Sequence, residues 1–318
     1  MREVLTVIPG ETPAAYRAAA EAAEAEEGAA ARSAVEEKTG RRRNLAYPPA
    51  PEPLPVPVMD NHTHLDFRDG LVEVGVAAAL DAAEAVGVRG AVQVGCDLAS
   101  SRFTIAALEA EPRLLGAVAI HPNDAPPLAA GGSLEAALAE IEELAAHPRV
   151  RAVGETGLDY FRTQGEALKD QEYSFRRHID LAKRLDLALQ IHDRDAHDDV
   201  VRILAAEGAP DRVVFHCFSG GPELARICND RGWYMSFAGT TSFKNSAQLR
   251  EALQLADPGL VLVETDAPFL TPHPYRGRPN ASYMVPYTVR AMAAILGKDL
   301  ARLCSEVAFN TESVYGQW

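Results

Sequence analysis

Short runs of consecutive apolar residues recur along the chain, separated by longer stretches with helical periodicity. Such runs are typical of strands that are buried on both faces of a parallel sheet. They predict strands at 56–60, 90–95, 115–120, 150–154, 188–192, 212–216, 233–237 and 260–264. The alternation of strands and helices predicts an α/β fold, and eight strands within about 250 residues favour closure into a TIM-type (β/α)8 barrel.

The stretches between the apolar runs, and those after the last run, carry the helical pattern. They predict helices at about 71–86, 100–110, 133–146, 170–186, 196–207, 222–231, 246–256, 284–296 and 299–314. No Gly-x-Gly-x-x-Gly follows the first apolar run, which counts against an open dinucleotide-binding sheet. We therefore expect residues 59–318 to form the barrel domain.

Residues 1–58 differ from the rest and predict an N-terminal extension. Alanine and glutamate dominate from Thr12 to about Lys38, and both favour helix. Thr12 and Pro13 fit the N-cap and the first position of that helix. Closely spaced prolines between residues 48 and 57 then predict a stiff, extended connector. We expect the extension to lie against the barrel or to be free, and the alternative is a partner-docking peptide.

Five of the apolar runs end in residues that can bind a metal. These residues are His62 and His64 after the first run, Glu155 after the fourth, His192 after the fifth, His216 after the sixth and Asp266 after the eighth. The C-terminal ends of barrel strands share one face, so these side chains are expected to meet at one point. Imidazole and carboxylate ligands together suit one or two divalent cations in a hydrolytic site.

Each of these residues is a weak signal when it is taken alone. His62 and His64 are two apart, so extended backbone places both imidazoles on one side, although such a pair also occurs in ordinary loops. Glu155 lies between glycines that allow a tight turn, and its two oxygens can bridge two cations. Asp266 can bind a metal and accept a proton from a metal-activated water. A lone residue of this kind at a strand end is more often structural, and only the combination favours a site.

Of three further residues near these positions, two are expected to support the site and one is not expected to bind a metal. Asp60 precedes the histidine pair, and by the two-residue period of a strand it is expected to face the same way and to orient a neighbouring group. His121 ends the third apolar run and is expected to assist the site. Cys217 follows His216, but adjacent side chains of a strand point to opposite faces, so we do not expect it to be a ligand.

Composition and charge narrow the classes of protein further. The chain has 318 residues, of which 47% are hydrophobic and 24% are charged, as in an ordinary globular protein. No apolar stretch approaches the ~20 residues that span a bilayer, and none near the N-terminus resembles a signal peptide. We therefore expect a cytoplasmic protein without a membrane partner. We also expect a monomer. The net charge of −14 argues against broad electrostatic capture of nucleic acid, although bound cations can reverse the local field.

The ordered motifs resemble those of the TatD family of metal-dependent deoxyribonucleases, within the amidohydrolase-like barrels. The resemblance covers about residues 59–318 and leaves the first 58 outside it. The matching motifs are Asp60-Asn-His62-Thr-His64, Ile120-His121-Pro122, Val153-Gly-Glu155-Thr-Gly-Leu-Asp159, Ile191-His192-Asp-Arg194, His216-Cys-Phe-Ser-Gly220 and Glu264-Thr-Asp266-Ala-Pro268.

The resemblance implies two divalent cations, usually Mg²⁺ or Mn²⁺, although a histidine-rich site also accepts Zn²⁺. It assigns the first cation to His62, His64, Glu155 and Asp266, and the second to Glu155, His192 and His216. It also implies phosphodiester hydrolysis, with single-stranded DNA trimmed from its 3′ end, so the expected partner is a DNA substrate.

Three arginines on the expected βα loops are candidates for binding substrate phosphate, and each is equally well an ordinary surface residue. They are Arg162, Arg194 and Arg276. Asp193 departs from the family pattern, which commonly has a small hydroxyl residue there. An added carboxylate beside the site would change metal preference or repel phosphate.

Two other functions remain open at this point. The same metal site could hydrolyse another bond, such as an ester on aminoacyl-tRNA, an amide or a lactone. Many relatives with those activities bridge their metals with a modified lysine after the fourth strand, whereas this chain has Glu155 there. An inactive barrel used for binding is the third possibility, although such a barrel would usually lack a ligand.

Overall fold

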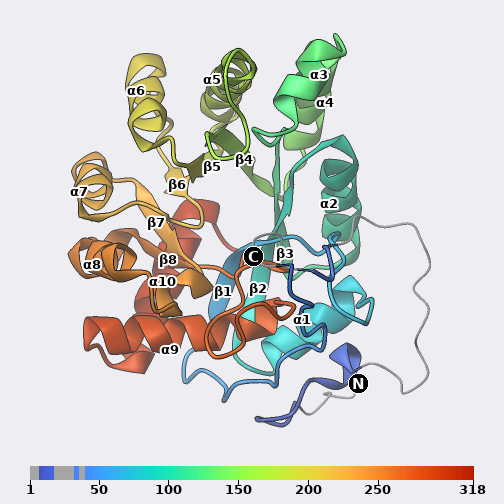
Figure 1. The fold of residues 1–318 in the computed structure, drawn as a ribbon, viewed down its shortest axis with the longest axis vertical. Helices are drawn as coiled ribbons and strands as arrows, with labels where there is room; N and C mark the ends of the chain where they lie inside the picture. Colours follow the sequence, from blue (N-terminus) through green and yellow to red (C-terminus); the bar gives the residue numbers. More distant parts are fainter. Residues whose placement is uncertain (1–6, 18–31, 36–39) are drawn as a thin grey trace.

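A computed structural model describes residues 7–17, 32–35 and 40–318. It confirms the predicted barrel: eight strands, each parallel to the next, form one sheet in chain order, and the helices surround it (Figure 1). The strands are β1 (Val58–Thr63), β2 (Val88–Gly95), β3 (Leu114–Val118), β4 (Val150–Asp159), β5 (Ala188–Arg194), β6 (Val213–Phe215), β7 (Tyr234–Phe237) and β8 (Val261–Val263).

The helices predicted for residues 59–318 are present within about five residues of their expected bounds. The helices are α1 (Val76–Glu84), α2 (Leu98–Ala110), α3 (Ala125–Ala130), α4 (Leu134–Ala145), α5 (Ala167–Leu185), α6 (His197–Glu207), α7 (Pro222–Arg231), α8 (Ala247–Leu255), α9 (Val285–Leu296) and α10 (Leu300–Tyr315), with short 3-10 turns η1 (Ala14–Tyr16), η2 (Gly239–Ser242), η3 (Pro258–Leu260) and η4 (Ser282–Met284). Helix α3 was not predicted, because its two prolines suggest a loop although prolines fit the first turn of a helix. Within the described ranges, every helix is too short or too polar to cross a bilayer.

Alternate residues of most strands face two different apolar layers, as β2 shows. Val92 and Val94 of β2 belong to the cluster inside the barrel, whereas Ala91 belongs to the layer beneath the helices. The end of α10 adds Val314 and Tyr315 to the inner cluster. The continuous apolar runs seen in the sequence arise because both faces of every strand are buried.

Closure between β1 and β8 depends on only a few hydrogen bonds. The Asp266 N–H donates to the His62 carbonyl at 3.0 Å, and the His64 N–H donates to the Ala267 carbonyl at 2.8 Å. The Asn61 side chain adds a bond from Nδ2 to the Val263 carbonyl at 2.7 Å. Closure therefore joins the two residues at the end of β1 directly to the loop that carries Asp266.

The described part of the extension does not form the predicted helix. Its only helical residues are the 3-10 turn η1, after which Arg17 is already extended. Thr12 does not act as an N-cap, because its hydroxyl donates to the Tyr47 carbonyl at 3.0 Å. Tyr16 is buried beside the rings of Tyr47 and Tyr283, and this docking competes with helix formation. The predicted helix at 18–31 and 36–39 lies outside the described residues.

The proline-rich connector lies against the barrel. Hydroxyl groups of Tyr283 and Tyr287 donate to the carbonyls of Pro48 and Pro49 at 2.6 and 3.3 Å. Further along, Arg290 donates to the carbonyl of Pro53 at 3.1 Å. Because proline has no N–H, its carbonyl is its only backbone hydrogen-bonding group, and η4 and α9 supply the donors.

Candidate metal centre

The six side chains singled out in the sequence meet at the C-terminal mouth of the barrel, around the carboxylate of Glu155. Oxygen Oε1 of Glu155 lies 3.7 Å from Nε2 of His62 and 3.4 Å from Nε2 of His64. Oxygen Oε2 lies 2.8 Å from Nε2 of His216 and 3.1 Å from Nδ1 of His192. The two oxygens of one carboxylate therefore face two separate groups of imidazoles.

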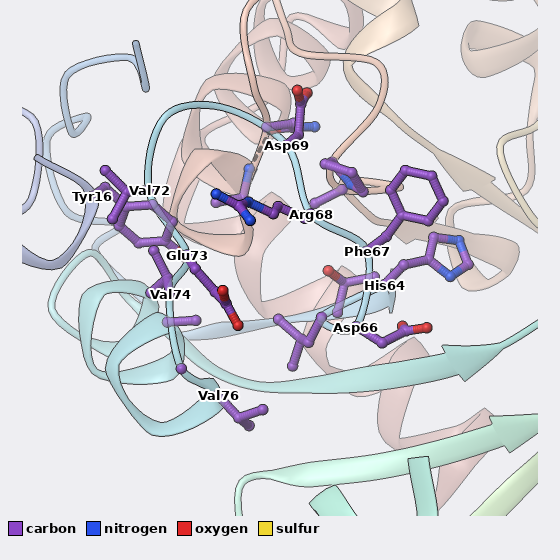
Figure 2. Close-up of a pocket in the computed structure, with 18 of the residues that line it drawn as sticks. Tyr16, His64, Asp66, Phe67, Arg68, Asp69, Val72, Glu73, Val74 and Val76 are labelled. Atoms are coloured by element: carbon purple, nitrogen blue, oxygen red, sulfur yellow. Dashed lines mark hydrogen bonds between the residues drawn. The ribbon is translucent and has the colours of Figure 1, made fainter. Parts of the chain in front are cut away.

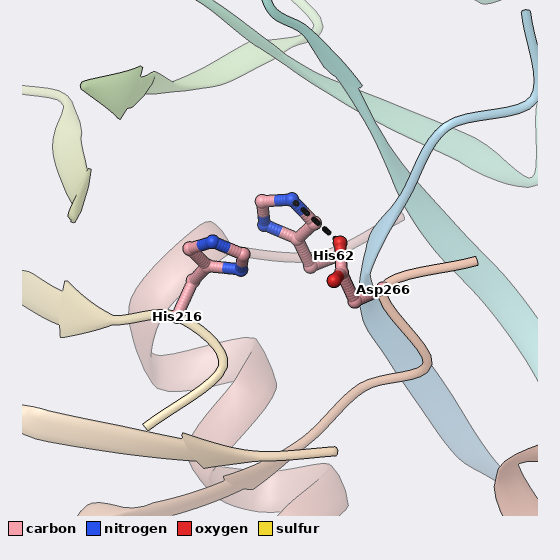
Figure 3. A group of neighbouring side chains, drawn as sticks. All are labelled: His62, His216 and Asp266. Atoms are coloured by element: carbon pink, nitrogen blue, oxygen red, sulfur yellow. Dashed lines mark ion pairs between the residues drawn. The ribbon is translucent and has the colours of Figure 1, made fainter. Parts of the chain in front are cut away.

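The first group comes from β1 and the loop after β8. His62 and His64 bring their Nε2 atoms within 3.2 Å of each other. Asp266 lies close to both, with Oδ1 at 3.9 Å from Nε2 of His62 and 3.5 Å from Nε2 of His64. Figure 3 shows His62, Asp266 and His216 pointing toward one another from three separate segments. This group offers three or four ligand atoms to one cation.

The second group comes from β5 and the end of β6. The ring of His216 stacks on that of His62, with centroids 3.8 Å apart, so the two groups adjoin. The Cα of Gly157, on β4, is so close to β5 that a Cβ there would lie 2.1 Å from the His192 carbonyl oxygen. Gly157 therefore allows β4 and β5 to lie close together, and this brings His192 to the carboxylate of Glu155.

Partners on the far side of three histidines fix which ring nitrogen faces the centre. Nδ1 of His64 lies 2.9 Å from the Val94 carbonyl, which can only accept, so Nδ1 carries the proton and Nε2 presents a lone pair. Nδ1 of His216 lies 3.3 Å from Oε1 of Glu264. Nε2 of His192 lies 3.3 Å from Oδ2 of Asp159. Carboxylate or carbonyl partners of this kind are typical of metal-binding histidines, and so the residues present fit divalent cations.

The electrostatics of the centre also fit bound cations. Burial alone would raise the pKa of Glu155, but His216, His121 and His192 hold it well below its ordinary value. Burial opposes protonation of His64, yet Asp266 and Glu155 raise its pKa to about 9. The buried carboxylates thus favour a positive charge at the imidazole nitrogens beside them. A metal ion bound to those nitrogens can supply this charge in place of protons.

His121 reaches the second group with a different tautomer. Its Nε2 lies 3.3 Å from Nδ1 of His192 and 3.8 Å from Oε2 of Glu155. The N–H of Asn123 donates to its Nδ1 at 3.1 Å, so the proton of the neutral ring is on Nε2. Burial lowers the pKa of His121 to about 3, which keeps the ring neutral. His121 therefore presents a hydrogen-bond donor to the centre rather than a lone pair.

Asp60 does not face the cluster in the way that strand parity predicts. The register between β1 and β2 shifts between Asp60 and Thr63, which breaks the two-residue period. Both Asp60 oxygens instead accept bonds from Thr265, from its N–H at 2.8 Å and from its hydroxyl at 2.6 Å. Burial raises the pKa of Asp60 to about 7. Asp60 therefore fixes the residue before Asp266, which is an orienting role.

Two orienting carboxylates were not identified as site residues from the sequence. Glu264 is fully buried, and its Oε1 also accepts the Cys217 N–H at 2.8 Å. Asp159 accepts a bond from the side chain of Asn123 at 2.9 Å, in addition to facing His192. A signal was present at Glu264, because a carboxylate within an apolar run two residues before Asp266 must be buried and therefore paired.

The surroundings of the cluster differ from the sequence-based expectation at Asp193 and at the cysteines. Asp193 does not add a carboxylate to the centre, because its Oδ2 pairs with Nδ1 of His197 at 2.7 Å. The thiol that contacts the centre belongs to Cys96 at the end of β2, with Sγ 3.2 Å from Oε1 of Glu155. Cys217 has a left-handed backbone with φ of +43°, which takes the chain out of the strand directly after His216.

The candidate phosphate-binding arginines lie at the same mouth: Arg194 is the last residue of β5 rather than a loop residue as predicted, and Arg162 and Arg276 lie on the loops after β4 and β8. Arg194 places its guanidinium 3.9 Å from the ring centroid of Phe161, and Arg276 lies 4.3 Å from that of Phe243. Arg162 is exposed on the loop after β4, where its backbone N–H donates to Asp159 at 2.9 Å. Two of the three arginines are thus held on aromatic rings.

A separate cavity of about 200 Å³ lies beside the metal centre. It is lined by the loop between β1 and α1, the segment after Asp266, and Tyr16 and Tyr47 of the extension. Figure 2 shows this loop, with His64 at one end of the cavity wall and Tyr16 at the other. Among the six clustered residues, His64 alone contributes to the wall. The extension therefore borders a space next to the centre.

We expect Glu264→Gln to weaken metal binding about 10- to 100-fold, as is usual when the partner of a metal-binding histidine is removed. The amide can still accept the Cys217 N–H, but it lacks the charge that keeps the proton on Nδ1 of His216. Calorimetric titration of the metal-free protein with Mn²⁺ measures the change. Asp193→Asn is the matched control, because it also neutralises a carboxylate paired with a histidine, and equal losses in both variants would contradict the assignment.

Comparison with known proteins places the chain in a family. The model of the TatD related DNase family matches residues 59–316. An uncharacterized metal-dependent hydrolase TatD of Mycobacterium tuberculosis is 45% identical over 263 residues, which is 81% of this chain and 98% of the relative. The metal-dependent hydrolase YabD of Bacillus subtilis is 35% identical over 261 residues, with the same coverage of both chains.

Solved structures share the fold. The crystal structure of YjjV, a TatD homologue from Escherichia coli, superposes with a TM-score of 0.73 at 24% identity, and the match covers 82% of this chain and 98% of that one. The family match begins at residue 59, so the N-terminal extension lies outside it. The chain belongs to the TatD family of metal-dependent hydrolases.

Proposed function

We propose that this hydrolase is a deoxyribonuclease that cleaves phosphodiester bonds and trims single-stranded DNA from its 3′ end. The observation that carries the proposal is the position of Glu155, whose two oxygens face two groups of imidazoles. A carboxylate so placed suits a pair of cations about 3.5–4 Å apart, which is the arrangement that phosphodiester displacement uses. The family description as TatD related DNases supports the same substrate.

In this proposal His62, His64, Glu155 and Asp266 hold one cation, and Glu155, His192 and His216 hold the other. When bound, divalent cations such as Mg²⁺ or Mn²⁺ supply the charge that activates a water and offsets negative charge on the phosphoryl group. Asp266 accepts the proton of the attacking water, because His64, His216 and His62 hold its pKa below its ordinary value despite burial and so keep it ionised. His121 donates a hydrogen bond from Nε2 into the second group.

Arg194 and Arg276 are the proposed contacts for phosphates of the DNA strand, with Arg162 on the neighbouring loop. A guanidinium binds phosphate oxygens through a planar fork of donors. The aromatic ring beneath each of the first two arginines restricts its rotation, which reduces the entropy lost on binding. All the proposed ligands come from one chain, so a monomer suffices for the reaction.

Chelation is expected to abolish hydrolysis of single-stranded DNA, and Mg²⁺ or Mn²⁺ is expected to restore it. Oligonucleotides labelled at the 5′ or the 3′ end identify the polarity: digestion from the 3′ end releases the 3′ label at once and shortens the 5′-labelled strand stepwise. An aminoacyl-tRNA and a lactone are tested in parallel. Cleavage of either one, with DNA left intact, would replace the nuclease proposal by the esterase alternative.

A further inference from the structure

Arg32, a residue of the N-terminal extension, lies at the mouth of the metal centre. Its Nη1 donates to the Pro268 carbonyl at 3.2 Å, two residues after Asp266. Its guanidinium lies 5.3 Å from the ring centroid of Phe269, and that ring is 6.4 Å from the ring of His64. Arg32 is therefore separated from a proposed metal ligand by a single aromatic side chain.

The backbone around Arg32 is fixed by several contacts. The Arg32 N–H donates to the Arg68 carbonyl at 3.1 Å, which attaches this segment to the loop after β1. Val35 pairs with Arg42 in an antiparallel bridge. The Arg43 side chain donates to the Ser33 carbonyl at 2.8 Å. These bonds specify where the guanidinium of Arg32 stands relative to the barrel.

The charge of Arg32 is not required to neutralise its neighbour. Both oxygens of Asp69 already bind Arg43, at 2.9 and 2.6 Å, and Arg32 adds only one contact at 3.4 Å. Burial and the nearby Arg43 lower the pKa of Arg32, and Asp69 and Asp266 act against this shift. Its side chain is 28% exposed, and among the described residues its Nε and Nη2 make no hydrogen bond. An anionic group is the partner that this arrangement lacks.

In the part of the chain that the structure describes, Arg32 is one of three arginines whose guanidinium lies over a phenylalanine ring at the mouth. The pairs are Arg32 with Phe269, Arg194 with Phe161 and Arg276 with Phe243. Alternating cations and rings suit a single nucleic-acid strand, because phosphates bind the cations and bases stack on the rings. Two of the pairs belong to the barrel, whereas Arg32 comes from outside the residues that the family model matches.

We propose that Arg32 binds a phosphate of the DNA strand next to the bond that is cut, so that the N-terminal extension is part of the substrate site. This inference rests on the proposed function. A purely structural arginine that ties two loops together is the competing role. The two roles differ because a phosphate contact acts only on substrates with a second phosphate, whereas a structural tie affects every substrate.

The test compares the full-length wild type with Arg32→Gln and Arg32→Lys. One substrate is single-stranded DNA of 12 nucleotides, and the other is the p-nitrophenyl ester of thymidine 5′-phosphate, which has no flanking phosphate. We expect Arg32→Gln to raise KM for the DNA about 10-fold and to leave kcat/KM for the ester unchanged. In DNA binding measured by anisotropy with Ca²⁺, the slope of log K against log salt should fall by about 0.7, the value for one phosphate contact on a single strand.

Arg32→Lys should retain that slope because it keeps the charge. Arg17→Ala is the matched control, since it removes an exposed cation of the same extension, whose side chain contacts Glu11 and the Thr12 carbonyl. Equal losses on both substrates would show a structural tie and overturn the inference, as would an unchanged KM and slope. A wild type that cleaves neither substrate would overturn the proposed function and this inference together, whereas normal cleavage by Arg32→Gln overturns the inference alone.

Discussion

Replacing Glu155 by alanine is expected to remove both cations and to reduce turnover at least ~1000-fold, which corresponds to about 4 kcal/mol of transition-state stabilisation. The two oxygens of this carboxylate face the two sets of imidazoles, so its loss removes a ligand from each proposed cation at once. The substitution also removes the negative charge that lies between the imidazoles of His62 and His64 and those of His192 and His216.

Elemental analysis of the purified variant and steady-state kinetics on single-stranded DNA measure the two effects. Glu155→Gln is the closer comparison, because it keeps the shape and one acceptor oxygen while it removes the charge. Asp193→Asn should retain both metal and activity, since Asp193 faces His197. Full turnover by Glu155→Ala would show that the centre has been assigned to the wrong residues.

Asp69→Ala is expected to lower the free energy of unfolding by about 3–5 kcal/mol, the usual cost of leaving one partner of a buried ion pair alone. Arg43 and Asp69 form a two-bond pair with side chains only 2% and 0% exposed. The same pair joins the extension to the loop after β1, and Arg43 also donates to the Gly277 carbonyl at 2.9 Å. Asp69→Ala therefore leaves the buried cation of Arg43 without its partner and weakens the connection among the extension, the loop after β1 and the segment that contains Gly277.

Urea unfolding followed by circular dichroism measures this change. Glu11→Ala removes an ion pair of the same extension whose side chains are both 52% exposed, and it should alter stability by less than about 1 kcal/mol. The double variant Arg43→Met, Asp69→Leu should recover much of the loss, because no unpaired charge remains. A small effect of Asp69→Ala would show that the extension contributes little to the folded state.

The barrel was predictable from the sequence because its strands have an unusual signature. Both faces of each strand are buried, so apolar runs such as Val213–Phe215 stand out against the amphipathic helices around them. The convergence of His62, Glu155, His192 and Asp266 followed from the same fact, since parallel strands of a barrel end on one face. No detail of packing was needed for either prediction.

The orientation of individual side chains was not predictable in this way. Strand parity placed Asp60 beside the histidines, but an irregularity in β1 turns it toward Thr265. Strand parity is a local rule. The register shift between Asp60 and Thr63 lies where β1 contacts both β2 and the residues after β8. The pairing of Asp193 with His197 and the contact of Cys96 with Glu155 likewise depend on neighbours that no short sequence window contains.

The succession of strands and helices and the identity of the six residues at the mouth could be predicted without coordinates, because both depend on periodicity and chain order. The course of the extension at residues 12–17 depends instead on packing, because Tyr16 is buried against Tyr47 and Tyr283 and the expected first turn of a helix is absent there. The tertiary structure also decided the position of Arg32, because contacts with residues far along the chain, including Asp69 and Pro268, fix that side chain beside the metal centre.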